Sequence, residues 1–259
     1  MKDNPSTKSP IKDPPLRVAG QSLREEIHDL AYGRLLAGWI AIVMVLVMAG
    51  MEWVQWTLRM PPMPLLGTCV AIVAVGIICW WLRGSIRQLR QLLLGYKGEL
   101  AVGQALEQTR TKGYQVFHDI LQEGFNIDHA IVGPAGVFCI ETKTRRKPAR
   151  GQSKVIFDGE QITVDGHTPD RDPANQTKAL ARRLSGLVRE IVGKDVFVQP
   201  VVLYVGWWVD PPIRPELWVC NETAFPKLLD HEPVRLTPEE VQRIASGLTI
   251  YLRERERQR

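Results

Sequence analysis

Two long apolar stretches stand out in the pattern of hydrophobic and polar positions along the chain. The first covers Leu35–Met51 (LLAGWIAIVMVLVMAGM) and the second covers Leu65–Leu82 (LLGTCVAIVAVGIICWWL). Neither contains a charge, and each is apolar on every face, whereas the core helix of a small domain keeps a polar stripe. Each is about as long as a helix that crosses a bilayer. The pattern predicts two transmembrane helices, at about 35–54 and 65–82; the alternative is a pair of buried core helices.

The residues around these stretches predict their orientation. Both stretches end in tryptophans, which are enriched at membrane interfaces: Trp53, Trp56, Trp80 and Trp81. The connection between them holds one charge, Arg59, and basic residues flank the pair on the outside: Arg17, Arg24, Arg34, Arg83, Arg87, Arg90 and Lys97. Because positive flanks stay in the cytoplasm, we expect a multi-pass protein of the inner (cytoplasmic) membrane with both termini in the cytoplasm. Residues 1–30 are polar and contain prolines, so we expect a flexible cytoplasmic tail there.

The chain after the second stretch alternates between helix and strand patterns. Helical spacing continues to about Thr111, and a strand pattern follows at Tyr114–Ile120. Asn126–Thr144 (NIDHAIVGPAGVFCIETKT) has the pattern of two apolar strands around a Gly-Pro-Ala-Gly turn. Lys154–Gly166 has the pattern of a second hairpin, with Asp158-Gly159 as its tight turn.

The last third of the chain continues the alternation. Asp172 can cap a helix that has Pro173 at its first position, and apolar strands follow at 196–206 and 217–220. A capping box of Thr237 and Glu240 begins a last helix, whose end (RERERQR) is expected to fray. This order predicts an α/β fold, a mixed sheet flanked by helices and preceded by a transmembrane helical hairpin over residues 31–83. We expect the soluble domain over residues 84–235 and a C-terminal helix over residues 236–259.

Composition narrows the function only slightly. The 259 residues carry a formal net charge of +5 and give a pI of about 9.1, which suits nucleic acid or an anionic membrane surface but is common. The four cysteines show no metal-ligand spacing, so we expect no zinc site. There is no GxGxxG, no Walker loop and no evident Ser-His-Asp set. Dinucleotide, P-loop and triad chemistry are therefore not indicated.

The hairpin at 126–144 carries charges where a packed core should be apolar. With the turn centred on Pro134-Ala135, Asp128 lies opposite Glu141, and Lys143 lies two residues further on the same face. Two carboxylates directly opposite each other repel. Either Lys143 alone or a divalent metal could balance them, and carboxylate oxygens are the ligands that Mg²⁺ prefers.

Two more polar residues interrupt apolar helix faces. Glu99 lies on a stripe with Tyr96, Val102 and Leu106, and Gln176 lies one turn before Leu180. A single polar residue in such a stripe is usually a satisfied residue at its end. Several of them converging on one place are a stronger signal, because buried charge is costly unless it is paired or metal-bound.

At this point the residues resemble a known group of proteins. Asp128, Glu141 and Lys143 form D-x(12)-E-x-K between a helix with Glu99 and a helix with Gln176, which resembles the PD-(D/E)xK nuclease superfamily. More narrowly, KGELAVGQAL, VFHDI, NIDHAIVGPAGVFCIETKT and DPANQTKALARRL are similar to the nuclease-related (NERD) domain, over about residues 98–229. The chain departs from the superfamily's name in having Ile127 at the proline position, a position at which the superfamily is permissive.

The resemblance implies a restriction-endonuclease-like fold and a metal-dependent site. Asp128 and Glu141 would hold Mg²⁺ (or Mn²⁺), with the carbonyl of Thr142 as a further ligand. Lys143 would orient the attacking water and stabilise charge on the phosphate.

The same resemblance gives roles to the two helix residues. Glu99 would support the metal site, and Gln176 would position Lys143 or a phosphate. A basic segment then follows the hairpin, and we expect it to bind nucleic-acid backbone, with a solvated charged loop as the alternative: Arg145, Arg146, Lys147 and Arg150.

The leading interpretation is a membrane-anchored, Mg²⁺-dependent nuclease that hydrolyses phosphodiester bonds of cytoplasmic nucleic acid, with DNA favoured. One alternative is a catalytically inactive nuclease-like module that binds nucleic acid or a protein partner at the membrane. Another is a membrane-anchored scaffold whose acidic residues are structural. The sequence does not decide the oligomeric state.

Overall fold

A computed structural model describes residues 14–58, 64–122, 124–148, 153–210, 213–214 and 216–258. The chain divides into two compact units. One is formed by Ser22–Tyr96, and the other combines the described residues up to Gln21 with those from Lys97 onward. The second unit is called the domain below.

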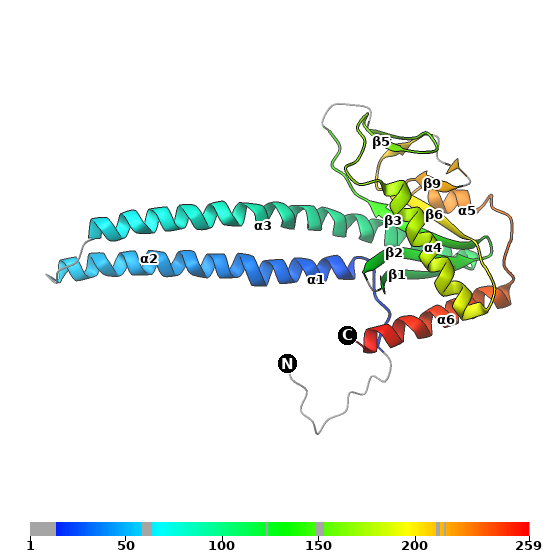
Figure 1. Ribbon diagram of the computed structural model, residues 1–259, viewed down its shortest axis with the longest axis horizontal. Coiled ribbons are helices and arrows are strands. Elements are labelled where there is room, and N and C mark those ends of the chain that lie inside the picture. The colour runs from blue at the N-terminus through cyan, green and yellow to red at the C-terminus, as the bar shows by residue number, and fades with distance from the viewer. Residues whose placement is uncertain are drawn as a thin grey trace, which may run out of the picture. The chain divides into compact units, whose positions relative to one another are not determined.

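The unit of Ser22–Tyr96 is an antiparallel pair of helices (Figure 1). Helix α1 (Gln21–Asp29) passes through a π-helical segment (Leu30–Leu35) into α2 (Leu36–Thr57), and α3 (Pro64–Glu107) returns. Contacts join the two along their length. The indole Nε1 of Trp53 donates to Thr68 Oγ1 at 3.0 Å, and Gly38 lies against Leu82, where a Cβ would overlap that side chain.

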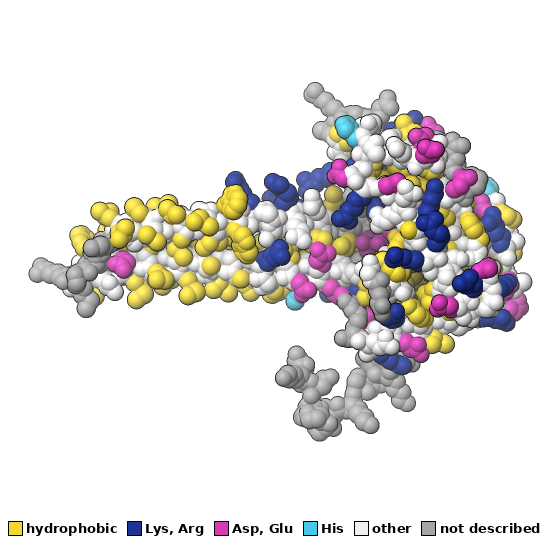
Figure 2. All heavy atoms as spheres, in the orientation of Figure 1, with side chains coloured by type: hydrophobic (Ala, Val, Ile, Leu, Met, Phe, Trp, Pro, Cys, Tyr) yellow, Lys and Arg dark blue, Asp and Glu magenta, His cyan; other side chains and the backbone are white. Residues whose placement is uncertain are grey.

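Apolar side chains cover the surface of this helical pair (Figure 2). Among the described residues, two helices are long and apolar enough to cross a membrane, and only 11% of the most apolar stretch of each is buried. Core helices would have that surface packed against protein. The structure therefore favours the predicted membrane helices over the alternative of two buried core helices.

The expected flexible tail was wrong in part. Residues 1–13 of the expected flexible tail lie outside the described residues, but α1 already begins at Gln21, and Leu16 packs against the core of the domain. The second span and the helix that follows it are a single helix, α3, because no proline interrupts the sequence between Pro64 and Glu107. A short 3₁₀ segment (Gln108–Lys112) ends it.

The domain is built on a mixed six-stranded sheet of order β1-β2-β3-β6-β9-β8. Neighbours β3–β6 and β6–β9 are parallel, and the other pairs are antiparallel. The strands are β1 (Gln115–Gln122), β2 (Phe125–Gly133), β3 (Gly136–Lys143), β6 (Val198–Tyr204), β8 (Ile213–Arg214) and β9 (Leu217–Cys220). The predicted α/β fold, a mixed sheet flanked by helices and preceded by two long apolar helices, is confirmed.

Helices cover both faces of this sheet. Alternation along β2 and β3 sends Ala130 and Cys139 to the face covered by α4 (Pro173–Val192) and α6 (Pro238–Arg257). Ile131 and Phe138 point to the other face, where the end of α3 and α5 (Phe225–Leu229) complete a second core. Residues of one strand thus hold helices on both sides in fixed positions.

The turn between β2 and β3 has the predicted register. Val132 pairs with Val137 and Gly133 with Gly136, which leaves Pro134-Ala135 as the two-residue turn. The carbonyl of Pro134 accepts from the backbone amides of Arg235 and Leu236 at 2.8 and 3.1 Å, so the segment before α6 anchors the turn.

A second, three-stranded sheet has the order β5-β4-β7, with β4 (Lys154–Phe157), β5 (Ile162–Val164) and β7 (Trp208–Val209). Its hairpin loop differs from the expected two-residue turn. Phe157 pairs with Ile162, so the loop has four residues, and Asp158 Oδ1 accepts from the amides of Glu160 and Gln161. The aspartate side chain closes the loop in place of a tight backbone turn.

Both predicted helix starts are confirmed. Asp172 caps α4 with Pro173 after it, and Thr237 and Glu240 form the capping box of α6. The C-terminal end, which was expected to be a frayed helix end, is helical to Arg257. Glu256 there binds Arg17 of the N-terminal segment at 3.3 Å, which gives this turn of helix a tertiary contact.

Candidate active site

The candidate site lies where the ladder between β2 and β3 ends. The last paired residues are His129 and Ile140, so Asp128 and Glu141 occupy the next register position, just beyond the end of the ladder. The Asp128 side chain reaches across instead, and its Oδ2 accepts the backbone N–H of Thr142 at 2.7 Å. The two carboxylates therefore lie next to each other beyond the end of the β2–β3 ladder, and Asp128 is fixed through Thr142.

Lys143, Glu141 and Gln176 form a closed set of hydrogen bonds. The Lys143 ammonium donates to Glu141 Oε1 at 2.7 Å and to Gln176 Oε1 at 3.3 Å, and Gln176 Nε2 donates to the same Glu141 oxygen at 2.9 Å. Glu141 is only 5% exposed, whereas the Lys143 side chain is 27% exposed. The carboxylate and the amide thus hold the base of the site, and the ammonium remains open to solvent.

The sequence at the start of α4 explains why Gln176 lies beside Glu141 and Lys143. Asp172 Oδ1 accepts from the amides of Ala174 and Asn175, and Pro173 fixes the first turn of α4. Gln176 lies in the next turn, on the face that packs toward β3 and β6. The cap therefore determines where the amide of Gln176 lies.

Burial and like charges raise the pKa values of two acids in the site. Burial is the main cause that raises the pKa of Asp128 well above its usual range, and the negative charges of Glu141 and Glu99 raise it further. The hydrogen bond from the Thr142 N–H and the charge of Lys143 act in the opposite direction. Burial, and after it the negative charges of Asp119 and Glu141, raise the pKa of Glu99 to about 7. A hydrogen bond from the Gly20 backbone lowers it by a smaller amount. The site thus holds more negative charge than its own lysine balances, which is the condition under which a bound cation is stabilising.

Asp119 and Arg17 were not recognised from the sequence as parts of this environment. Asp119 lies on β1 between the pairs His118–His129 and Ile120–Ile127, which places it across from Asp128, and its φ of 50° is left-handed. Arg17 Nε donates to Asp119 Oδ2 at 2.7 Å, and both side chains are at least nine-tenths buried. An aspartate within the apolar strand VFHDI was the available signal, of the same kind that pointed to Asp128.

The donor set suits a hard divalent cation. Asp128 Oδ1 and Glu141 Oε2 receive none of the hydrogen bonds that hold the opposite oxygens of these carboxylates. No group of three or more His, Cys, Asp or Glu side chains arranged to hold a metal occurs among the described residues. Two carboxylates with a backbone carbonyl and waters are a usual environment for Mg²⁺, and oxygen ligands alone disfavour zinc.

The predicted basic segment follows β3 directly. Arg145, Arg146 and Lys147 are exposed, and the carbonyl of Arg145 accepts from the indole Nε1 of Trp207 at 3.3 Å. Arg150 lies outside the described residues. The segment therefore begins next to Lys143 with its cationic side chains in solvent.

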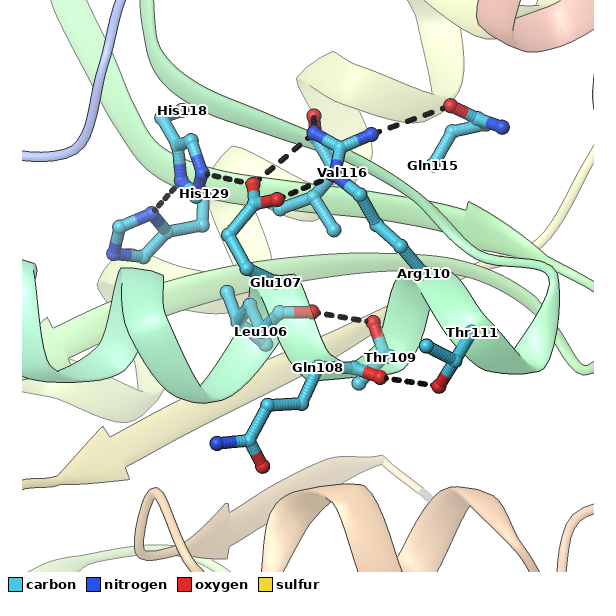
Figure 3. A network of polar contacts seen from close by, with 10 residues as sticks. All are labelled: Leu106, Glu107, Gln108, Thr109, Arg110, Thr111, Gln115, Val116, His118 and His129. Atoms are coloured by element: carbon cyan, nitrogen blue, oxygen red, sulfur yellow. Dashed lines mark hydrogen bonds and ion pairs between the residues drawn. The ribbon is translucent and has the colours of Figure 1, made fainter.

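A separate polar network occupies the other side of β2 (Figure 3). The Nδ1 atoms of His118 and His129 lie 2.8 Å apart, and His118 Nε2 lies 3.0 Å from Glu107 Oε1. Arg110 donates twice to Glu107 and once to the carbonyl of Val116. Burial lowers the pKa of both histidines, which favours their neutral form, and the Glu107 of the ion pair with Arg110 contacts His118. It links the end of α3 to β1 and thereby to Asp119.

Comparison with known proteins agrees with the geometry. A family model described as nuclease-related domain (NERD) matches residues 94–205. This segment includes Glu99, Asp119, Asp128, Glu141, Lys143 and Gln176, but not Arg17. The searches of curated proteins and of solved structures each found no match.

Proposed function

Because this chain contains a nuclease-related domain over residues 94–205, we propose that it is a membrane-anchored nuclease that hydrolyses phosphodiester bonds of nucleic acid, with DNA as the substrate and Mg²⁺ as the cofactor. The observation that carries the proposal is the set of Lys143, Glu141 and Gln176 beside Asp128. Its arrangement supports the roles expected from the sequence. A structural ion pair would need neither the amide nor the second carboxylate.

The acidic residues and Lys143 have different roles in the proposed reaction. Asp128, Glu141 and the carbonyl of Thr142 would hold Mg²⁺, which when bound would polarise the phosphate and lower the pKa of water. Lys143 has three ammonium donors, of which Glu141 and Gln176 take two, so the third can donate to the attacking water or to a phosphate oxygen.

The remaining residues position Lys143, add negative charge near the metal site and bind the substrate. Gln176 fixes the rotamer of Lys143, and Glu99 adds negative charge that favours the cation. Arg145, Arg146 and Lys147, with Arg150 from the same segment, would bind the phosphates on either side of the cleaved bond.

The N-terminal segment supports a membrane topology with both ends on one side. Leu16 and Arg17 precede the first apolar helix, yet they pack in the same unit as residues 97–258. The chain must therefore return to the side from which it left. Exposed Arg83, Arg87 and Arg90 follow the second apolar stretch, and by the positive-inside rule that side is the cytoplasm.

Nicking of supercoiled plasmid by the full chain, purified in detergent, tests the proposal. The full chain is required because Arg17 belongs to the same unit as the site. We expect nicking with Mg²⁺, none with a chelator, and a loss of at least about 100-fold in Asp128→Asn, Glu141→Gln and Lys143→Met, each of which removes a charge from the site. Lys112→Met, which removes an exposed lysine paired with Asp230, is the control and should retain activity.

Two results would count against the proposal. Cleavage that survives Asp128→Asn would place the activity elsewhere or in a contaminant. A folded protein that binds DNA but cleaves neither DNA nor RNA with Mg²⁺ or Mn²⁺ would favour the alternative, an inactive module that binds nucleic acid.

Labelling with a membrane-impermeant maleimide tests the topology in a chain whose four cysteines are replaced by serine or alanine. Leu58→Cys, at the end of α2, should be labelled from outside intact cells, whereas Arg146→Cys should require permeabilised cells. The opposite pattern would invert the proposed orientation.

A further inference from the structure

Trp208 is the most exposed aromatic side chain among the described residues of the domain. It is 67% exposed, whereas its neighbour Trp207 is 2% exposed and packs in the core. The two rings point to opposite faces of the chain, as successive residues in extended backbone do. A large aromatic side chain that is exposed to water does not contribute the stabilisation that its burial would give. An indole that points outward from a strand therefore suggests a binding surface.

The backbone that carries Trp208 is held firmly. Trp208 pairs with Lys154 in the parallel ladder of β7 and β4, and Asp210 N donates to the carbonyl of Val155 at 3.0 Å. Lys154 and Asp210 form an ion pair of 2.9 Å. Ile156, 43% exposed, lies on the same face of β4 as Lys154, so the indole borders a flat and partly apolar surface.

This surface adjoins the candidate site. Val205 N donates to the carbonyl of Lys143 at 3.1 Å, and Trp208 follows only three residues later, which limits the distance between the backbones of Val205 and Trp208 to about 10 Å. The indole Nε1 of Trp207 donates a hydrogen bond to the carbonyl of Arg145. The segment that carries the exposed indole is therefore bonded both to the end of β3 at Lys143 and to the start of the basic segment at Arg145.

We propose that Trp208 stacks on an unpaired nucleobase beside the cleaved phosphodiester, so that the substrate is single-stranded nucleic acid or a single-stranded end. This inference rests on the proposed function and names the substrate class of the same site. Base pairs in a duplex hide their faces in the stack, so only an unpaired base offers a face to the indole. Stacking of this kind tolerates any base, and neighbouring cations hold the backbone phosphates.

Binding measured without cleavage tests this inference. The full chain in detergent, with chelator present, is titrated into fluorescein-labelled single strands of 12 nucleotides, as DNA and as RNA, and into a blunt hairpin duplex. Trp208→Ala should weaken binding of a single strand by about 5- to 150-fold, the range measured for loss of one stacked base. Trp208→Phe keeps a ring and should remain within about threefold of the unmodified chain, and the duplex should bind equally well to all variants.

Phe197→Ala provides the matched control. Phe197 is also an exposed aromatic (62%), but it precedes β6, whereas Trp208 follows it, so the two lie at opposite ends of that strand. It should not change binding. Equal losses in Phe197→Ala and Trp208→Ala, equal losses on single strand and duplex, or no loss in Trp208→Ala would each overturn the inference.

The outcome can be separated from that of the proposed function. A selective loss of single-strand binding in Trp208→Ala, in a chain that cleaves neither single strands nor plasmid with Mg²⁺ or Mn²⁺, would support the stacking surface and reject the nuclease. Mg²⁺-dependent cleavage with unchanged binding by Trp208→Ala would reject the stacking surface alone.

Discussion

Arg17 and Asp119, 102 residues apart in sequence, form a buried ion pair of 2.7 Å that joins the segment before the first apolar helix to the sheet. The side chains are 7% and 5% exposed. Glu256 of α6 also binds Arg17, and the Gly20 backbone binds Glu99. The segment at 14–20 thus supplies the fold with a cation at the edge of the acidic site.

Arg17→Met should destabilise the protein by about 3–5 kcal/mol, because it leaves the Asp119 charge buried without its partner. Thermal melting of the full chain in detergent measures this effect. Lys112→Met is the control, since its ion pair with Asp230 is 39% and 49% exposed and such pairs contribute about 0–1 kcal/mol. Equal melting temperatures for the two variants would show that the Arg17 pair contributes no more than a surface pair.

The sequence predicted the hairpin of the site well because its determinants are local. Strand alternation and a two-residue turn are enough to bring Asp128 level with Glu141 and to place Lys143 on the same face. The amide of Gln176 was also within reach of such reasoning, because the Asp172 cap determines where α4 begins.

Other features could not be predicted in this way. The Arg17–Asp119 pair joins distant segments and leaves no periodic trace in the sequence. The left-handed backbone of Asp119 is a conformation that aspartate adopts more often than most residues but still rarely, so the sequence does not specify it at this position.

Asp128→Asn should separate stability from metal binding. Asparagine keeps a carbonyl oxygen for the Thr142 N–H but removes a charge beside Glu141 and Glu99. In chelator at pH 8, the variant should melt at or above the temperature of the unmodified chain. Mg²⁺ at 100 times its Kd should stabilise the unmodified chain by about 2.7 kcal/mol and leave the variant unchanged. An equal Mg²⁺ shift in both would remove Asp128 from the metal site.

The metal-free protein should lose stability as pH rises between about 4.5 and 7. Burial, Asp119 and Glu141 raise the pKa of Glu99 from 4.5 to about 7, so the folded state binds a proton that the unfolded state has released in this interval. Stability from this group is therefore complete below pH 4.5 and is lost as the pH passes 7. Melting temperatures in chelator measure the slope, which Glu99→Gln should reduce, since glutamine does not titrate. An unchanged slope in Glu99→Gln would assign the effect to another group.

Added Mg²⁺ should oppose that slope. A metal binds the deprotonated carboxylates, so its stabilising effect should increase with pH over the same interval. Melting temperatures with and without saturating Mg²⁺, measured at pH 5, 6, 7 and 8, give the difference directly. Ca²⁺, which takes oxygen ligands at longer distances, serves as a comparison ion. A Mg²⁺ effect that is constant with pH would mean that the raised acids do not take part in binding.

Gly98→Ala should displace the end of β3 and thereby the site. A Cβ at Gly98 of α3 would overlap Oγ1 of Thr144, the residue after Lys143, whereas a Cβ at Gly186 of α4 meets nothing within 4 Å. Gly98→Ala should therefore cost about 1–3 kcal/mol and reduce nicking, and Gly186→Ala should stabilise by about 0.5–1 kcal/mol because glycine is unfavourable within a helix. Melting temperature and plasmid nicking are measured on both. Thr144→Ala, which removes the overlapping oxygen, should restore part of the loss in the double variant, since residues in contact are not additive. If Gly98→Ala stabilises the protein as Gly186→Ala does, the close approach of α3 to β3 is wrong.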